Sequence, residues 1–302
     1  MTQIQPRPLT VLWIFTALIM GAPQARASEL HLRYEANWGG LHVADFGLSL
    51  INGGNTYENR FHLETRGMTR YFTNMSVQAT SRGHVITPPP AAQDATQSVG
   101  NASGQHLAET YQADTYRTEY TNKKHFRWVD IAFGKNGDPA HASTGTSPIQ
   151  GREDAWNPAE KGPEVLETVD AEHRVGTSDP ITMIPQMMAM VRAHFSGGPA
   201  TARIKGFDGR RRFDLNIAYL GPASRTVGNT LHETYRVRVT PDPVAGFKNR
   251  HRVLWNNSVY DFYLSRDGNF VPLQIVPVNH GPVLTLVTQC TTACVIEAEE
   301  VD

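Results

Sequence analysis

Cysteine is scarce in this chain: only Cys290 and Cys294 occur among its 302 residues. In an oxidising compartment a close pair of cysteines more often forms a disulfide than a ligand set. Residues four apart on a straight strand lie about 13 Å from each other, whereas a disulfide needs Cα atoms within about 7 Å. A disulfide between them therefore requires a tight turn, and two free thiols are the alternative. The spacing excludes a CxxC redox site, and a zinc site lacks its other ligands.

Long hydrophobic runs are also missing, apart from one near the N-terminus. Arg7 precedes the apolar run Leu9 to Met20, which is about a dozen residues long and shorter than the roughly twenty of a spanning helix. Ala25-Arg26-Ala27, followed by Ser28, is a small-x-small cleavage site. We predict a signal peptide over residues 1–27, cut between Ala27 and Ser28. The mature chain is then soluble, and periplasmic or secreted; an uncleaved N-terminal anchor is the alternative.

The chain has no excess of positive charge and no common catalytic motif. It carries 28 basic and 29 acidic side chains, and loss of Arg7 and Arg26 with the signal peptide lowers the net charge further. Nucleic acid is therefore not an expected partner. GxSxG, P-loop and GxGxxG motifs are absent, and the 12 histidines lack metal-ligand spacing. No cofactor, metal ion or catalytic residue is predicted, although an active site assembled from distant residues stays open.

Apolar and polar residues alternate along most of the mature chain, as in strands with one buried face. The first run places five apolar residues on one face: Leu30, Leu32, Tyr34, Ala36 and Trp38. Later strands are predicted at 231–240, 258–265, 270–277 and 282–289, and the short turns between runs indicate antiparallel pairing. Pro272 cannot donate to a ladder, so its strand is expected at a sheet edge or with a bulge.

One segment departs from this alternation and predicts a helix. Asp179-Pro180 is a typical helix start and Gly197-Gly198 a typical end, so the helix should span about 180–195. Pro185 should bend this helix or delay its start. Met183, Met187 and Met190 share one face, with Ile184 adjacent. Methionine adapts to irregular apolar partners, so this stripe is either core or the lining of a ligand site.

The remaining features each allow a structural and a functional interpretation. Trp38 is expected to pack on the sheet, with a ligand contact as the alternative. Arg210 to Arg212 follow a tight turn and should form a solvated hairpin tip. Residues 88–110 and 134–178 are rich in proline, glycine, small residues and charge, and are predicted to be flexible insertions in a single β-rich domain, residues 28–302.

Three separated stretches resemble the domain-of-unknown-function family 3108 of exported bacterial proteins. They are Tyr34-Glu35-Ala36-Asn37-Trp38-Gly39-Gly40-Leu41, then Asp179-Pro180-Ile181-Thr182 with Arg192, and Tyr263-Leu264-Ser265-Arg266-Asp267 with Pro272-Leu273. Ala44 and Tyr263 depart from the family pattern, which usually has glycine and tryptophan there. The resemblance implies a mainly antiparallel β protein of the Gram-negative cell envelope, and it supplies no established activity.

Together these features predict a mainly β (α+β) fold. We expect a large curved antiparallel sheet or incomplete β-barrel, with one helix packed on the concave side. Such folds often hold apolar ligands between sheet and helix. The leading hypothesis is a non-enzymatic periplasmic protein that binds a lipid or another apolar or amphipathic envelope component. The alternatives are an envelope scaffolding protein with a protein partner, and a periplasmic hydrolase without a recognisable motif.

Overall fold

The computed structural model describes residues 28–86, 110–134, 138–148, 169–279 and 281–291. In this part of the chain thirteen strands form one antiparallel sheet, in the order β7-β6-β5-β4-β3-β2-β1-β13-β12-β11-β10-β9-β8. The sheet is not closed, because β7 and β8 stand at its two ends. The prediction of a mainly antiparallel β fold is confirmed.

The sheet consists of two meanders in which each strand pairs with its neighbour in the chain. The first contains β1 (Ser28–Trp38), β2 (Leu41–Asn52), β3 (Thr56–Thr65), β4 (Ser76–Ile86), β5 (Thr110–Thr121), β6 (His125–Phe133) and β7 (Pro139–Pro148). The second contains β8 (Thr201–Phe207), β9 (Arg212–Val227), β10 (Thr230–Ala245), β11 (Tyr260–Ser265), β12 (Pro272–Pro277) and β13 (Val283–Cys290). The antiparallel pair of β1 and β13 joins the two meanders.

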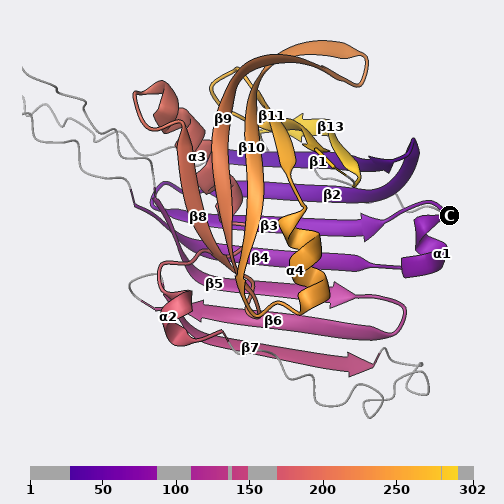
Figure 1. The fold of residues 1–302 in the computed structure, drawn as a ribbon, viewed down its shortest axis with the longest axis vertical. Coiled ribbons are helices and arrows are strands. Elements are labelled where there is room, and N and C mark those ends of the chain that lie inside the picture. Colours follow the sequence, from indigo (N-terminus) through magenta and orange to yellow (C-terminus); the bar gives the residue numbers. More distant parts are fainter. Residues whose placement is uncertain (1–27, 87–109, 135–137, 149–168, 280, 292–302) are drawn as a thin grey trace, which may run out of the picture.

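The second meander folds back across the first. In Figure 1, strands β8 to β10 run across strands β1 to β7. Gly209, in the turn between β8 and β9, lies so close to Val129 of β6 that a side chain at position 209 would overlap it. Gly209 also has a φ of 89°, which glycine adopts without strain. The space between the meanders is filled by a core cluster that includes Leu32, Ile131 and Phe207.

Helix α3 (Met183–Phe195) lies on the concave side, between the two meanders. The regular helix starts at Met183, three residues later than predicted, but the Asp179 carboxylate accepts the backbone N–H groups of Ile181 and Thr182, each at 3.0 Å, as expected of the N-cap at Asp179-Pro180. These bonds hold the intervening residues in a turn. Pro185 lies in the first turn of the helix, where its missing N–H costs no intrahelical hydrogen bond.

Several sequence predictions need correction. The sequence predicted one helix, but the described residues also form α1 (Thr69–Thr73), α2 (Ala171–Arg174) and α4 (Asn249–Asn256). These helices are too short to give a clear periodicity. Strand β7 and helix α2 lie within 134–178, which we predicted to be a flexible insertion. β7 pairs with β6 along its whole length through backbone bonds, which need no apolar side chains.

Other parts of the two predicted insertions, residues 87–109 and 149–168, lie outside the described residues. Pro272 begins β12 at a register shift, where it lies opposite Leu264, so the predicted bulge is present. None of the helices in the described ranges is long and apolar enough to cross a membrane.

Candidate functional site at the end of the buried helix

The start of α3 is held by a buried carboxylate. Ser81 Oγ and Thr182 Oγ1 each donate to Asp179 Oδ2 at 2.7 Å, and Tyr57 OH lies 3.0 Å from Thr182 Oγ1. Asp179 is fully buried, and its burial raises the pKa of the carboxyl. Because these groups bond to one another and are closed to solvent, they fix the helix to β3 and β4 and form no reaction site.

The methionine stripe of α3 is buried in packed clusters. Met183 packs with Phe213, while Met187 and Met190 pack against inward-facing residues of β9, β10 and β11. Ile184 is half-buried and packs against the core between the meanders. The structure thus places the three methionines in the core of the second meander and Ile184 against the core between the meanders, and a ligand-lining role for them stays a prediction.

Trp38 does not join the helix residues. It is the last residue of β1 and lies opposite Leu41, beyond a register shift between Ala36 and Asn37. The turn that follows uses two glycines with positive φ, Gly39 and Gly40. The end of the hairpin therefore projects past the covered part of the sheet, and Trp38 is exposed, where we expected it to pack.

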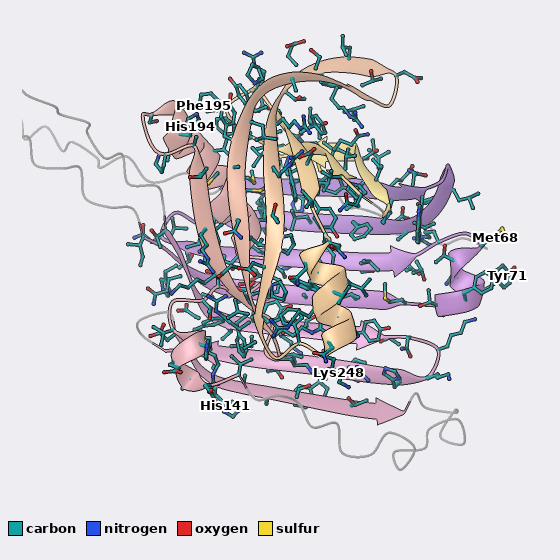
Figure 2. The ribbon with its side chains drawn as sticks, viewed as in Figure 1. Met68, Tyr71, His141, His194, Phe195 and Lys248 are labelled. Carbon is teal, nitrogen blue, oxygen red and sulfur yellow. The ribbon has the colours of Figure 1, made fainter. Side chains whose placement is uncertain are left out.

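Five aromatic side chains gather at the C-terminal end of α3. They are His194 and Phe195 of α3, Tyr219 of β9, Tyr235 of β10 and Phe270 of the β11–β12 connection, and we call them the aromatic cluster. The ring centroids of Phe195 and Tyr235 are 4.4 Å apart, and those of His194 and Tyr219 are 4.6 Å apart. The rings of Phe195 and Phe270 stack at 5.6 Å with an interplanar angle of 12°. Figure 2 shows His194 and Phe195 at this end of the helix.

The cluster is buried on one side and open on the other. Phe270 is buried and shares a core cluster with Met190, whereas Phe195 is 46% exposed. Phe270 also has a φ of 55°, an uncommon backbone conformation for a bulky residue and one that often marks a functional position. Partial burial raises the pKa of the Tyr219 phenol, so this ring stays neutral.

Two guanidinium groups border the cluster. The Arg192 guanidinium lies over the Phe270 ring at 5.8 Å, and that of Arg266 lies over the Tyr235 ring at 4.9 Å. Arg266 also lies 3.5 Å from Glu233, which is exposed. A cation over an aromatic face keeps its own charge while covering apolar surface. The site thus offers apolar ring faces with positive charge at their border, a combination suited to an amphipathic anion.

Sequence reasoning did not find this cluster. Tyr235 lies on a predicted strand and Phe195 ends the predicted helix, but nothing in the local pattern brings these two rings and that of Tyr219 together. Their meeting depends on how the second meander curves around α3. An aromatic residue in the last turn of a helix, directly before Gly197-Gly198, is the one available sequence signal.

A shallow groove of about 500 Å³ lies on the outer face of β8, β9 and β10. It is lined by Thr201, Ala202, Arg203, Asn216, Ile217, Ala218, Arg238 and Thr240. Arg203 Nε donates to Asp214 at 2.6 Å, and Arg238 Nε donates to Asp261 at 2.9 Å. Both cations on this wall are paired, and the predicted methionine stripe does not line the groove.

Arg212 also differs from its predicted position. It is buried, forms a 2.7 Å ion pair with Asp214 and donates to the His173 carbonyl oxygen at 2.9 Å. The prediction of a solvated tip over Arg210 to Arg212 is therefore wrong for this residue. Arg212 is the first residue of β9, so the alternation of this strand decides to which side of the sheet its side chain points.

Two clusters of polar side chains have the residue types of a catalytic or metal site but not the surroundings that such a site needs. Ser49 Oγ lies 2.8 Å from His31 Nδ1, and His31 Nε2 lies 3.4 Å from Glu29. These residues lie on paired strands whose backbone N–H groups serve the ladder, so no oxyanion donors accompany them. Asp170, Glu172 and His173 could approach one ion, but all three are exposed, and exposed acidic groups often occur without a metal.

Cys290 ends β13 and takes part in a disulfide in the structure. Its predicted partner, Cys294, lies outside the described residues, as do Ala27 and the rest of the predicted signal peptide. Ser28, the predicted first mature residue, is the first residue of β1. The pairing of the two cysteines and the cleavage position stay predictions.

Comparison with known proteins shows a likeness to a solved structure. It is the crystal structure of a β-barrel-like protein of domain of unknown function DUF1849 from Brucella abortus, with 8% sequence identity and a TM-score of 0.42. The match covers 88% of this chain and 98% of that chain. No protein-family model matches the chain, so the resemblance to family 3108 is not confirmed, and no curated protein matches it.

Proposed function

We propose that this chain is a non-enzymatic periplasmic protein that binds an amphipathic, anionic component of the cell envelope at the aromatic cluster. The observation that carries the proposal is the half-open stack of Phe195 on Phe270, bordered by Arg192. An acyl chain would lie on the exposed ring faces, and its acidic head would approach the guanidinium groups at the border.

The energetics favour this arrangement over a purely structural one. A half-exposed phenylalanine leaves apolar area in water that a ligand would cover, at about 25 cal/mol for each Å². Stacked rings held by a packed core lose little conformational entropy on binding. The core beneath the cluster, which includes Met190, supplies this rigidity. The buried methionine side chains of α3 then support the site from below, and the last turn of the same helix supplies Phe195 to it.

Titration with a fluorescent fatty acid, cis-parinaric acid, tests the proposal. The native protein should bind the probe, and lauric acid should displace it. Phe195→Ala removes the exposed ring and should weaken binding at least about tenfold, as expected for the loss of one large apolar contact. Leu254→Ala is the matched control, because Leu254 is a large exposed apolar residue of α4, outside the cluster. This variant should bind as tightly as the native protein.

The proposal fails if the native protein does not bind the probe, or if Phe195→Ala and Leu254→Ala bind equally well. Mass spectrometry of lipids that co-purify with the native protein identifies the natural ligand. Cross-linking in intact cells that traps one stoichiometric protein at this surface, without lipid, would favour the scaffolding alternative instead.

A further inference from the structure

Five large apolar side chains are exposed at one end of the first meander. Trp38 and Leu41 lie at the β1–β2 turn, and Met68, Tyr71 and Phe72 lie in and beside α1. Each is between 61% and 81% exposed. We call these five residues the apolar rim. Single exposed apolar residues are common in proteins, but a gathered set on one edge indicates an interaction surface.

The order of the strands brings these residues to one edge. The β1–β2 turn, the β3–β4 connection and the β5–β6 turn follow one another along the same side of the sheet (Figure 1). Arg66 N donates to the Val43 carbonyl oxygen at 2.9 Å, and Lys123 Nζ donates to the Tyr71 carbonyl oxygen. Neighbouring strands lie about 4.8 Å apart, so the midpoints of the β1–β2 turn and the β5–β6 turn are about 19 Å apart. Figure 2 shows Met68 and Tyr71 at this edge, away from His194 and Phe195.

The exposed side chains are carried on a fixed backbone. Thr65 Oγ1 donates to the Thr73 carbonyl oxygen at 3.1 Å and accepts the Met75 N–H at 3.0 Å, which closes the connection around α1. Helix α1 nevertheless buries none of its residues. Since packing does not explain its aromatic residues, they are free to contact something outside the chain.

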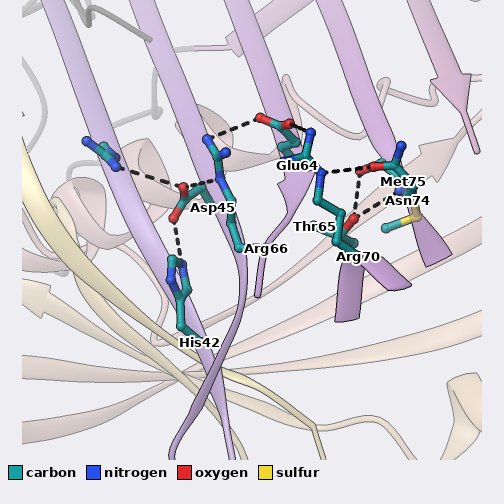
Figure 3. Close-up of polar contacts among 9 residues, drawn as sticks. His42, Asp45, Glu64, Thr65, Arg66, Arg70, Asn74 and Met75 are labelled. Atoms are coloured by element: carbon teal, nitrogen blue, oxygen red, sulfur yellow. Dashed lines mark hydrogen bonds and ion pairs between the residues drawn. The ribbon is translucent and has the colours of Figure 1, made fainter. Parts of the chain in front are cut away.

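An ion-pair network ties this connection to the sheet, as Figure 3 shows. Arg66 Nε donates to Asp45 at 2.8 Å, and Arg66 Nη2 lies 3.2 Å from Glu64. His42 Nε2 lies 2.8 Å from Asp45. Arg70 extends the network to Glu64 at 3.7 Å. The network holds the rim in place and leaves an excess of basic groups at this edge.

The edge of the sheet that carries the apolar rim has an excess of positive charge, although the whole chain does not. Segments 38–42, 66–75 and 121–125 contain Arg66, Arg70, Lys123 and Lys124, and no aspartate or glutamate. Even with Asp45 and Glu64 counted, basic groups remain in excess at this edge, whereas the whole chain has a net charge of −1. Apolar tips beside lysine and arginine are complementary to a surface that is apolar beneath an anionic layer.

We propose that the apolar rim rests on the surface of a bilayer that contains anionic lipids. Tryptophan and tyrosine are enriched at the membrane interface, and basic residues near an anionic surface contribute about 1 kcal/mol each. Lysine, by contrast, is depleted in interfaces between proteins. Three turns in one row also fit a flat surface better than a pocketed partner. This proposal concerns a different surface from the aromatic cluster and does not depend on it.

Co-sedimentation with vesicles tests the proposal. The native protein should bind vesicles of phosphatidylethanolamine and phosphatidylglycerol, and should bind phosphatidylcholine vesicles much more weakly. Tyr71→Ser with Phe72→Ser should reduce the partition coefficient at least about tenfold, because two aromatic side chains are lost from the contact. Lys124→Gln should reduce it about fivefold, and only on anionic vesicles, as expected for one basic group.

Val253→Ser with Leu254→Ser is the matched control. These residues of α4 are also exposed and apolar, but they lie outside the rim. The control should bind vesicles as the native protein does. All variants are compared with the same N-terminus, verified by mass spectrometry, so the apolar run of residues 9–20 contributes equally or not at all.

Equal binding by the native protein and the Tyr71, Phe72 double variant would overturn the proposal, as would equal binding to anionic and neutral vesicles. Stoichiometric capture of one protein by the native rim, without vesicle binding, would overturn it in favour of a protein partner. Since Phe195→Ala leaves the rim intact, failure of the fatty-acid titration and failure of this experiment are distinguishable.

Discussion

Helix α3 contains methionine and aromatic residues, and Met68 directly precedes helix α1 with its aromatic residues, yet the two helices differ in what they bury. Helix α3 buries seven of its thirteen residues between the two meanders. Helix α1 has five residues, none of them buried, and holds its aromatic side chains in water. Each is fixed beside an acid: Asp179 at the start of α3, and Asp45 beside the connection that contains α1.

The two acids differ as the two helices do. Asp179 is closed off from water and is satisfied by neutral hydroxyl and amide groups, whereas Asp45 lies among arginine and histidine side chains. A neutral network suits a packed core, because burying charges costs several kcal/mol. The charged network lies at the edge of the sheet, where the Arg66 and His42 side chains reach water, although Asp45 is also buried. The difference suggests that α3 serves stability and α1 serves contact.

Removal of the Asp179 carboxylate should have the largest effect. Asp179→Ala should lower the free energy of unfolding by about 4 kcal/mol, because two amide and two hydroxyl groups lose a buried acceptor. Urea denaturation followed by circular dichroism measures the change. A loss below about 1 kcal/mol would mean that the start of α3 does not depend on this carboxylate.

The same substitution on the two helices should separate them next. Met187→Ala should cost about 3 kcal/mol, since it removes a packed core side chain and leaves a cavity. Met68→Ala, beside α1, should change the free energy of unfolding by less than about 0.5 kcal/mol. Equal losses in the two variants would contradict the assignment of α3 to the core and of α1 to the surface.

The protonation of Asp179 should make stability depend on pH. Its folded-state pKa is raised by burial, so the native state holds this proton more tightly than the unfolded chain, whose aspartates have a pKa of about 3.9. The stability that this proton contributes is therefore full below about pH 4 and is lost as the pH rises through the folded pKa.

Asp179→Asn cannot titrate, so the native protein should lose stability relative to this variant as the pH is raised from about 3 to 7. Asp208, whose pKa is also raised by burial, is present in both proteins and cancels in the difference. Parallel stability curves for the two proteins would show that Asp179 keeps an ordinary pKa.

The smallest effect on stability is expected at the rim. Tyr71→Ser with Phe72→Ser should change the free energy of unfolding by less than about 0.5 kcal/mol, because both side chains are in water. Thermal unfolding without vesicles provides the measurement. A clear destabilisation would mean that these rings support the fold, and the loss of vesicle binding would then need another explanation.

The sequence predicts most of the sheet because alternation is a local property. The runs from Leu32 to Ala36 and from Val237 to Val239 bury the residues that their period indicates. Strand β7 was missed because it is held by its backbone ladder and has few apolar residues. Asp179 caps the N–H groups of Ile181 and Thr182, as its position before Pro180 indicates, and a turn over residues 180–182 precedes α3.

The candidate sites were harder to predict, since both depend on what covers a side chain. Trp38 continues the alternation of β1, but the covered part of the sheet ends before this residue. Phe195 and Tyr235 are forty residues apart and meet through the curvature of the second meander. Arg212 follows a turn, yet its ion pair with Asp214 is covered by the chain near His173. None of these contacts is encoded in a local period.

The ladder between β1 and β13 has a consequence for the order of folding. Each meander is built from local pairings, but the first strand of the chain lies in the middle of the sheet beside the last one. During synthesis, one backbone edge of β1 therefore stays unpaired until almost the whole chain has been made. An open edge of this kind is a template for pairing with other chains. The chain is thus most exposed to aggregation just before its final strand arrives.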